Sequence, residues 1–111
     1  MQIGTVKIES KLALAPMAGV TDAAFRQICS EKGAGYTVTE LVSAKALCYH
    51  DTKTAQLLRP FPGEKPFAAQ IFGSDVNCMA EAAQMAIEIS GADILDINMG
   101  CLLYTSPSPR D

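Results

Sequence analysis

The feature that most constrains the fold is the alternation of short, nearly continuous apolar segments with helical stretches. Such apolar segments predict parallel strands that helices bury on both faces. An earlier segment, Thr5 to Glu9, alternates in polarity and is predicted to form a hairpin with the first of them across Ser10. The four expected strands are Lys11 to Met17, Tyr36 to Val42, Phe67 to Gly73 and Ala92 to Asn98.

Capping residues and glycines delimit the expected helices. Thr21 or Asp22 is predicted to cap the first, with Phe25, Ile28 and Cys29 on its buried face. A second helix is expected from about Ser43 to Leu58. The third is expected to begin at Ser74 or Asp75 and to end at Gly91. Its apolar stripe is expected to consist of Met79, Ala82, Ala83, Ala86, Ile87 and Ile89.

The spacing of these units favours a barrel over a doubly wound sheet. Each strand and helix together take about 25 to 30 residues, as in a (β/α)8 barrel. A doubly wound sheet usually carries G-x-G-x-x-G after its first strand, whereas the first turn here begins at Pro16 and ends at Gly19. We therefore predict an α/β protein that is the N-terminal half of a TIM (β/α)8 barrel, spanning residues 1–101 and truncated after the fourth strand.

Composition narrows the class of protein. With 49% hydrophobic and 19% charged residues the chain is globular. A net charge of −3 gives no electrostatic footprint for nucleic acid, so an RNA-binding surface is expected elsewhere in a longer protein. The start lacks a basic and apolar leader, and no stretch of about 18 apolar residues occurs, which predicts a cytoplasmic protein without a membrane span.

The cysteines are far apart in the sequence. Four cysteines and the lone His50 predict neither a zinc site nor a disulfide framework. We interpret Cys29 and Cys78 as structural helix residues and assign no role to Cys48. Cys101 follows a glycine at a strand end, where a neutral thiol can act as a general acid; the alternative is a small apolar filler.

Residues at the carboxyl ends of the strands are the candidate binding groups, because barrel enzymes use that face. Pro16, followed by small residues, allows a flat ligand to approach the backbone, and Gln70 can both donate and accept hydrogen bonds. In the alternative, these residues only turn the chain or cap a strand. Glu40 and Asp96 are either a carboxylate pair or unrelated, with Asp96 facing the barrel interior.

The strand ends carry a resemblance to a known family. The chain resembles the tRNA-dihydrouridine synthases, and in particular their bacterial B-type branch. The matching segments are Leu14 to Asp22, Gly33 to Glu40, Ala69 to Gly73 and Asp96 to Cys101. The resemblance implies a flavin-binding TIM barrel that uses FMN and NADPH to reduce a uridine double bond in tRNA.

The resemblance also implies roles for individual residues. Pro16, Met17 and Ala18 would line FMN, and Gln70 would hydrogen-bond the flavin ring. Asn98 would contact the uracil, which has to leave its stack, and Cys101 would supply the proton after hydride transfer.

Two other enzyme classes remain open beside this one. Another FMN barrel, such as a dihydroorotate or enoate reductase, shares the strand-end chemistry. A Schiff-base lyase is disfavoured because Lys45, Lys53 and Lys65 lie outside the strand ends.

The last residues depart from the family pattern. Leu102 stands where the family has proline, and residues 101–111 can be back-translated into the transposase end and adapter of a sequencing library. We expect residues 102–111 to be an adapter-derived tail; the alternative is a natural Ser/Pro-rich tail. Without the later lysine and histidine, the phosphate loops and the tRNA-gripping domain, we expect the chain to be an inactive fragment.

Overall fold

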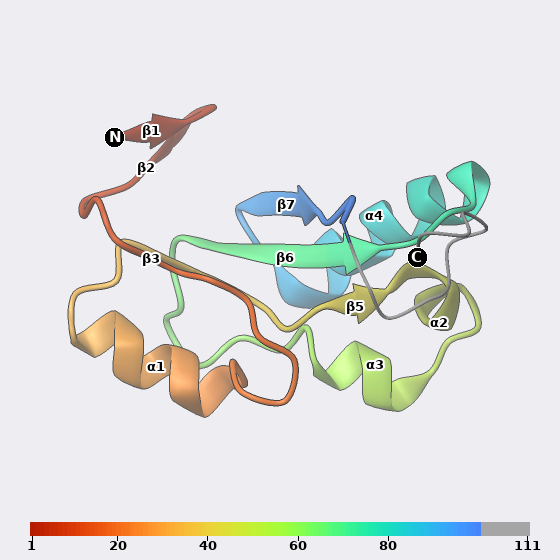
Figure 1. Ribbon diagram of the computed structural model, residues 1–111, viewed down its shortest axis with the longest axis horizontal. Helices are drawn as coiled ribbons and strands as arrows, with labels where there is room; N and C mark the ends of the chain where they lie inside the picture. The colour runs from red at the N-terminus through yellow and green to blue at the C-terminus, as the bar shows by residue number, and fades with distance from the viewer. Residues whose placement is uncertain (101–111) are drawn as a thin grey trace.

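The computed structural model describes residues 1–100 and has a mixed α/β fold built on a parallel sheet (Figure 1). The elements are β1 (Gln2–Ile3), β2 (Val6–Lys7), β3 (Ala13–Leu14), α1 (Ala23–Glu31), β4 (Tyr36–Val38), β5 (Val42–Ser43), α2 (Ala44–Cys48), α3 (Thr52–Gln56), β6 (Phe67–Phe72), α4 (Val76–Ser90) and β7 (Ile94–Ile97).

The main sheet confirms the predicted parallel order. β3 pairs with β4, β4 with β6, and β6 with β7, all in parallel. β5 pairs with the same edge of β6 as β4, because β7 occupies the other edge. Because all these strands run parallel, their carboxyl ends lie at the same end of the sheet (Figure 1).

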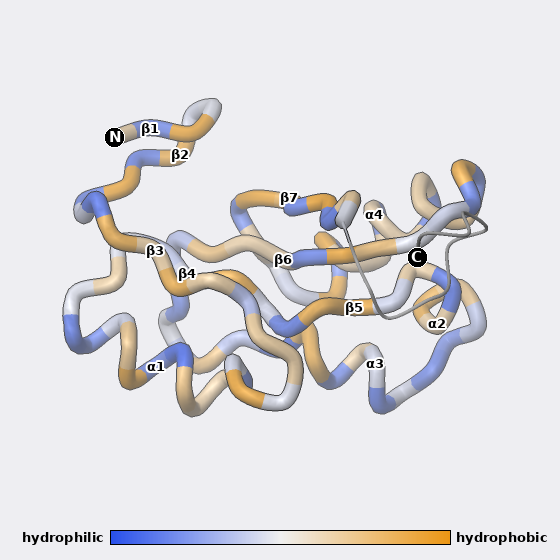
Figure 2. The backbone as a smooth tube through the Cα atoms, in the orientation of Figure 1, coloured by the Kyte–Doolittle hydropathy of each residue, from blue (hydrophilic) through white to orange (hydrophobic). Residues whose placement is uncertain are grey.

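One face of β6 packs against helices. Phe67, Ala69 and Ile71 join a buried cluster with residues of α2, α4 and Leu58, and each is at most 2% exposed. The intervening Ala68 and Gln70 lie on the opposite face, since side chains alternate along a strand. Figure 2 shows the apolar course of β6, which is interrupted by one hydrophilic stretch before the strand's apolar carboxyl end.

Helix α4 begins and ends where the sequence predicts. The Asp75 carboxylate accepts a hydrogen bond from the Cys78 amide at 2.9 Å, which satisfies a free donor of the first turn. Gly91 ends the helix with φ of 70°, a left-handed conformation that favours glycine. The predicted apolar stripe is correct for Ala82 and Ala86, which are buried, but Ile89 is 39% exposed.

Helix α1 has the predicted cap but a different buried face. Asp22 caps it by accepting from the Phe25 amide at 2.8 Å. Phe25 and Ile28 are nevertheless exposed, at 36% and 55%, and the buried residue is Arg26. The predicted apolar face is wrong because a buried ion pair takes the place that hydrophobic side chains usually fill.

That ion pair joins α1 to the segment before β6. Arg26 donates from Nε and Nη2 to the two carboxylate oxygens of Glu64, at 2.8 and 3.1 Å. Nη1 donates to the Thr21 carbonyl oxygen at 2.9 Å, and Nη2 also donates to the Arg59 carbonyl oxygen at 3.0 Å. Glu64 also accepts from the Thr37 hydroxyl of β4. Both charged side chains are 1% exposed, so the pair is enclosed, and all three guanidinium nitrogens donate hydrogen bonds.

The expected strand Tyr36 to Val42 is interrupted. Between the pairs Val38↔Ala68 and Val42↔Ile71, the β4–β5 side holds one residue more than β6, which is a bulge. Thr39 bridges the gap: its amide donates to the Ala68 carbonyl at 2.9 Å, and its hydroxyl accepts from the Gln70 amide at 3.0 Å. The bulge therefore leaves β6 hydrogen-bonded while it redirects Glu40.

Two further local predictions are wrong. The expected helix Ser43 to Leu58 is divided into α2 and α3, because the chain turns at His50, whose φ is 58°. The N-terminal hairpin joins β1 to β2, whereas the first strand of the main sheet, β3, pairs only with β4 among residues 1–100. Figure 1 shows this hairpin standing apart from the main sheet.

Candidate functional site at the strand ends

The loop after β3 carries Pro16, Met17 and Ala18 on a fixed backbone. Thr21, which is fully buried, accepts from the Met17 amide through its hydroxyl at 3.0 Å, and its own amide donates to the Met17 carbonyl at 2.9 Å. Arg26 in turn donates to the Thr21 carbonyl. The side chains of Met17 and Ala18 remain exposed, so the loop has a fixed backbone conformation and a surface that a ligand can reach.

Glu40 ties this loop to the neighbouring strand. The bulge turns its carboxylate toward the end of β3, where Oε1 accepts from the Gly19 amide at 2.6 Å. Gly19 has φ of 76°, so a side chain at this position would strain the turn. The contact fixes the carboxyl end of β3 relative to the β4–β5 strand.

Gln70 and Asp96 form the second polar contact of the site. Both lie on the sheet face opposite the helix-packed core, on neighbouring strands in register. Gln70 Nε2 donates to Asp96 Oδ2 at 2.5 Å. A carboxylate only accepts, so the amide nitrogen has to face Asp96 and the carbonyl oxygen Oε1 faces away. Gln70 is 6% exposed, and among residues 1–100 no group donates to that oxygen.

Asn98 follows β7 at the same edge. Its amide donates to the Ile71 carbonyl at 3.0 Å, which extends the pairing of β6 and β7, and its side-chain Oδ1 accepts from the Gly100 amide at 2.9 Å. Within residues 1–100 the side-chain Nδ2 donates to no protein group. The half-exposed side-chain amide of Asn98 is therefore held in place through Oδ1, and its Nδ2 is available to donate to a ligand.

The predicted site residues form two groups. Gln70 and Asn98 lie at the ends of adjacent strands, and Pro16, Met17 and Ala18 lie in the loop after β3. No hydrogen bond joins the two groups within the described part of the chain. The predicted general acid, Cys101, lies outside the described residues, as does the expected tail 102–111.

The structure decides between the two interpretations of the carboxylates. Glu40 contacts Gly19, and Asp96 contacts Gln70, so the two are not a hydrogen-bonded pair. Asp96 instead lies on the sheet face opposite the helix-packed core, hydrogen-bonded to Gln70. Among residues 1–100 no group of three or more His, Cys, Asp or Glu side chains is placed to hold a metal ion.

Sequence reasoning missed the residues that support the site from behind. Thr21 and Arg26 hold the first loop, and Thr39 closes the bulge. The sequence carried a signal for Arg26, which is a charged residue amid the expected apolar face of α1. A charge in such a position is retained only when a partner of opposite charge is buried with it.

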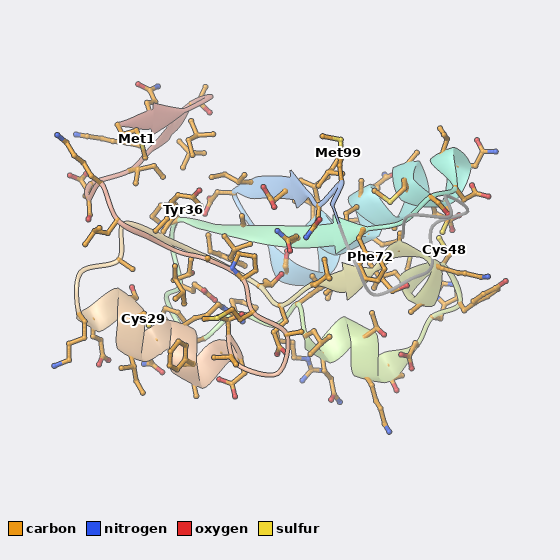
Figure 3. All side chains as sticks on the ribbon, viewed as in Figure 1. Met1, Cys29, Tyr36, Cys48, Phe72 and Met99 are labelled. Carbon is orange, nitrogen blue, oxygen red and sulfur yellow. The ribbon has the colours of Figure 1, made fainter. Side chains whose placement is uncertain are left out.

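A cavity of about 670 Å³ lies beside the site, between α2 and α4 at the ends of β5 and β6. Phe72 and Gly73 line it from the end of β6, and Cys48 and Cys78 line it from the helices. The side chains of Phe72 and Cys48 lie close together in Figure 3. The sequence assigned no role to Cys48 and did not indicate its contact with Cys78, whose sulfur lies 2.9 Å from that of Cys48.

These features define an α/β protein whose parallel strands end at a shared polar edge. None of the helices within residues 1–100 is long and apolar enough to cross a membrane. The sequence pattern of the family described as Dihydrouridine synthase (Dus) matches residues 13–105. The chain belongs to this family.

Curated relatives agree with that assignment. The chain is 45% identical over 102 residues to a protein named tRNA-dihydrouridine synthase B from Vibrio vulnificus (strain CMCP6), which covers 91% of the chain and 31% of the relative. It is 45% identical over 103 residues to the protein of that name from Escherichia coli (strain K12), with the same coverage. The chain therefore spans about 31% of the length of these relatives.

Proposed function

We propose that this chain is the N-terminal part of an FMN-dependent tRNA-dihydrouridine synthase, which reduces uridine in tRNA to dihydrouridine with NADPH. In this proposal residues 1–101 are the first four strands of a TIM (β/α)8 barrel with the helices between them. The family membership supports the reaction class. The observation that carries the site is the amide of Gln70, oriented by Asp96 on the face of β6 opposite the helices.

The strand ends fit a flavin in two respects. Gln70 Oε1 is an acceptor that no described residue uses, and the edge of a flavin ring carries an N–H donor. The loop at Pro16, Met17 and Ala18 presents a backbone that Thr21 holds in place, which suits contact with a flat ring. Bound FMN would supply the hydride that reduces the carbon-carbon double bond.

The remaining roles concern the uracil and a proton. Asn98 would orient the uracil by donating from its side-chain Nδ2. The Oδ1 atom of the same amide already accepts a hydrogen bond from the Gly100 amide, which fixes the side chain. Cys101, which follows Gly100 in the sequence, would give its thiol proton to the carbon next to the one that receives the hydride. The target base would have to leave its stack to reach these groups.

A chimera tests the proposal. Residues 1–100 would replace the aligned segment of the E. coli relative, and the chimera would be expressed in a strain that lacks that relative. We expect dihydrouridine to return to tRNA, seen by mass spectrometry of tRNA digests as a gain of two hydrogens on uridine. The unmodified E. coli relative serves as the positive control.

A negative result with the chimera can be interpreted. A soluble chimera with bound flavin that leaves tRNA unreduced would contradict the proposal. Reduction of orotate or of a small enone by the same chimera would favour the alternative FMN-barrel reductase.

The chain alone is expected to hold FMN weakly and to leave tRNA unreduced. It spans 31% of the relatives, and barrel enzymes bind phosphate mainly through loops after strands seven and eight. The measurement is flavin absorbance after the purified chain has been incubated with FMN and dialysed. Stoichiometric retention of flavin would show that the first four strands suffice.

A further inference from the structure

Cys48 and Cys78 bring two thiols together from helices that are distant in sequence. Cys78 Sγ lies 2.9 Å from Cys48 Sγ, although 30 positions separate them in the chain. The Cys48 thiol also donates to the Cys78 carbonyl oxygen at 3.4 Å. Both are free thiols. The two sulfurs are therefore in direct contact across the packing of α2 against α4.

Both thiols are reachable by a small molecule. They are partly buried rather than enclosed, and both line the cavity of about 670 Å³ between the two helices. The cavity also includes Phe72 and Gly73, where β6 ends. A reagent in this space meets the sulfurs and the edge of the strand-end site together.

The helices that carry the cysteines continue directly from strands of the site. Ser43 is both the last residue of β5 and the cap of α2, accepting from the Ala46 amide at 3.2 Å. At the other side, β6 passes through Gly73 to Asp75 into α4. A Cβ at Gly73 would lie 3.1 Å from Ala44 Cβ and 2.8 Å from Met79 Sδ, so the junction is already tight. A bond between the helices would fix two strand ends to each other.

We propose that Cys48 and Cys78 form a reversible disulfide that locks α2 to α4 beside the strand-end site. The oxidant is a low-molecular-weight disulfide of the glutathione class. One thiolate attacks that disulfide and releases the first small thiol, which leaves a mixed disulfide on the protein. The second cysteine then loses its proton, attacks the protein sulfur and releases the second small thiol. Two protein thiols are oxidised to one disulfide, and one small disulfide is reduced to two thiols.

The surroundings of the pair indicate which sulfur attacks first. The hydrogen bond with Cys78, partial burial and the negative charges of Cys78, Glu81 and Asp75 raise the pKa of the Cys48 thiol to about 11. Because this raised pKa disfavours the Cys48 thiolate, we assign the first attack to Cys78, and Cys48 resolves the mixed disulfide.

Disulfide mapping tests the proposal on the full chain. The protein would be equilibrated in glutathione buffers with an increasing oxidised fraction, quenched with acid, and mapped by mass spectrometry without reduction. We expect the Cys48–Cys78 linkage to exceed every linkage that involves Cys29 or Cys101, and to disappear after reduction. The melting temperature is expected to rise by about 10 °C on oxidation, because the bond closes a long loop.

Serine variants separate the pair from general thiol reactivity. Cys48→Ser is expected to stop at a glutathione adduct on Cys78, and Cys29→Ser is expected to behave as the unchanged chain. Linkages distributed equally among the cysteines, or adducts on the unchanged chain without a Cys48–Cys78 bond, would overturn the proposal. The test uses neither flavin nor tRNA, so its outcome does not depend on the proposed enzyme activity.

Discussion

Replacing Arg26 by methionine is expected to lower the free energy of unfolding by about 3 to 5 kcal/mol. The substitution removes the charge that faces Glu64 and leaves a carboxylate with 1% exposure, whose other hydrogen-bond donors within residues 1–100 are the Thr37 hydroxyl and the Phe61 amide. An uncompensated buried charge is costly, and small domains have total stabilities of only about 5 to 15 kcal/mol. Urea unfolding followed by circular dichroism measures the change.

An exposed ion pair in the same chain supplies the matched control. Lys7 and Glu9 lie 3.9 Å apart with side chains 77% and 81% exposed, so Lys7→Met is expected to change stability by less than about 1 kcal/mol. The double variant Arg26→Met with Glu64→Leu is expected to recover part of the loss, because no charge is then left buried. Equal effects of Arg26→Met and Lys7→Met would contradict the structural role of the buried pair.

Arg26 also links stability to the site. Its guanidinium donates to the Thr21 carbonyl, and Thr21 holds both backbone groups of Met17. Loss of Arg26 therefore removes support from the loop that carries the predicted flavin contacts. This coupling explains why Arg26 occupies the buried face of α1 while Phe25 and Ile28 lie on its exposed side.

The parallel sheet was predictable because its strands are short apolar runs between caps and glycines. The positions of β6, α4 and β7 agree with the prediction. Asp75 caps the start of α4 through a local hydrogen bond, and Gly91 ends the helix through its backbone conformation. Local signals of this kind are readable without knowledge of distant contacts. Several features that the sequence did not predict depend on distant partners instead.

Three examples make the distinction concrete. The inner face of α1 depends on Glu64, which lies 38 positions from Arg26. The interrupted strand depends on how Thr39 meets the backbone of β6, and the cysteine contact joins two helices across 30 positions. A single sequence does not state such pairings. In the site, strand ends were predictable as locations, but the contact of Gln70 with Asp96 required the register of β6 and β7.

Replacing Gln70 by leucine in the chimera is expected to weaken FMN binding by about 10- to 100-fold. If the proposed function is correct, the ring N–H of FMN then loses its acceptor inside a site where water cannot replace it. A buried donor left without a partner costs about 1 to 3 kcal/mol, and each 1.4 kcal/mol is tenfold in affinity. Titration of the apoprotein with FMN, followed by quenching of flavin fluorescence, measures the dissociation constant.

Two comparisons separate a lost contact from a damaged fold. Leucine has a volume close to that of glutamine, and residue 70 is only 6% exposed, so the variant is expected to keep the circular dichroism spectrum of the parent. Asp96→Asn keeps an oxygen that can accept from Gln70 Nε2 but adds an N–H that can pair with Gln70 Oε1, so FMN binding is expected to fall, though by less than in Gln70→Leu. A folded Gln70→Leu chimera with undiminished affinity for FMN would mean that the amide serves only to hold β6 against β7.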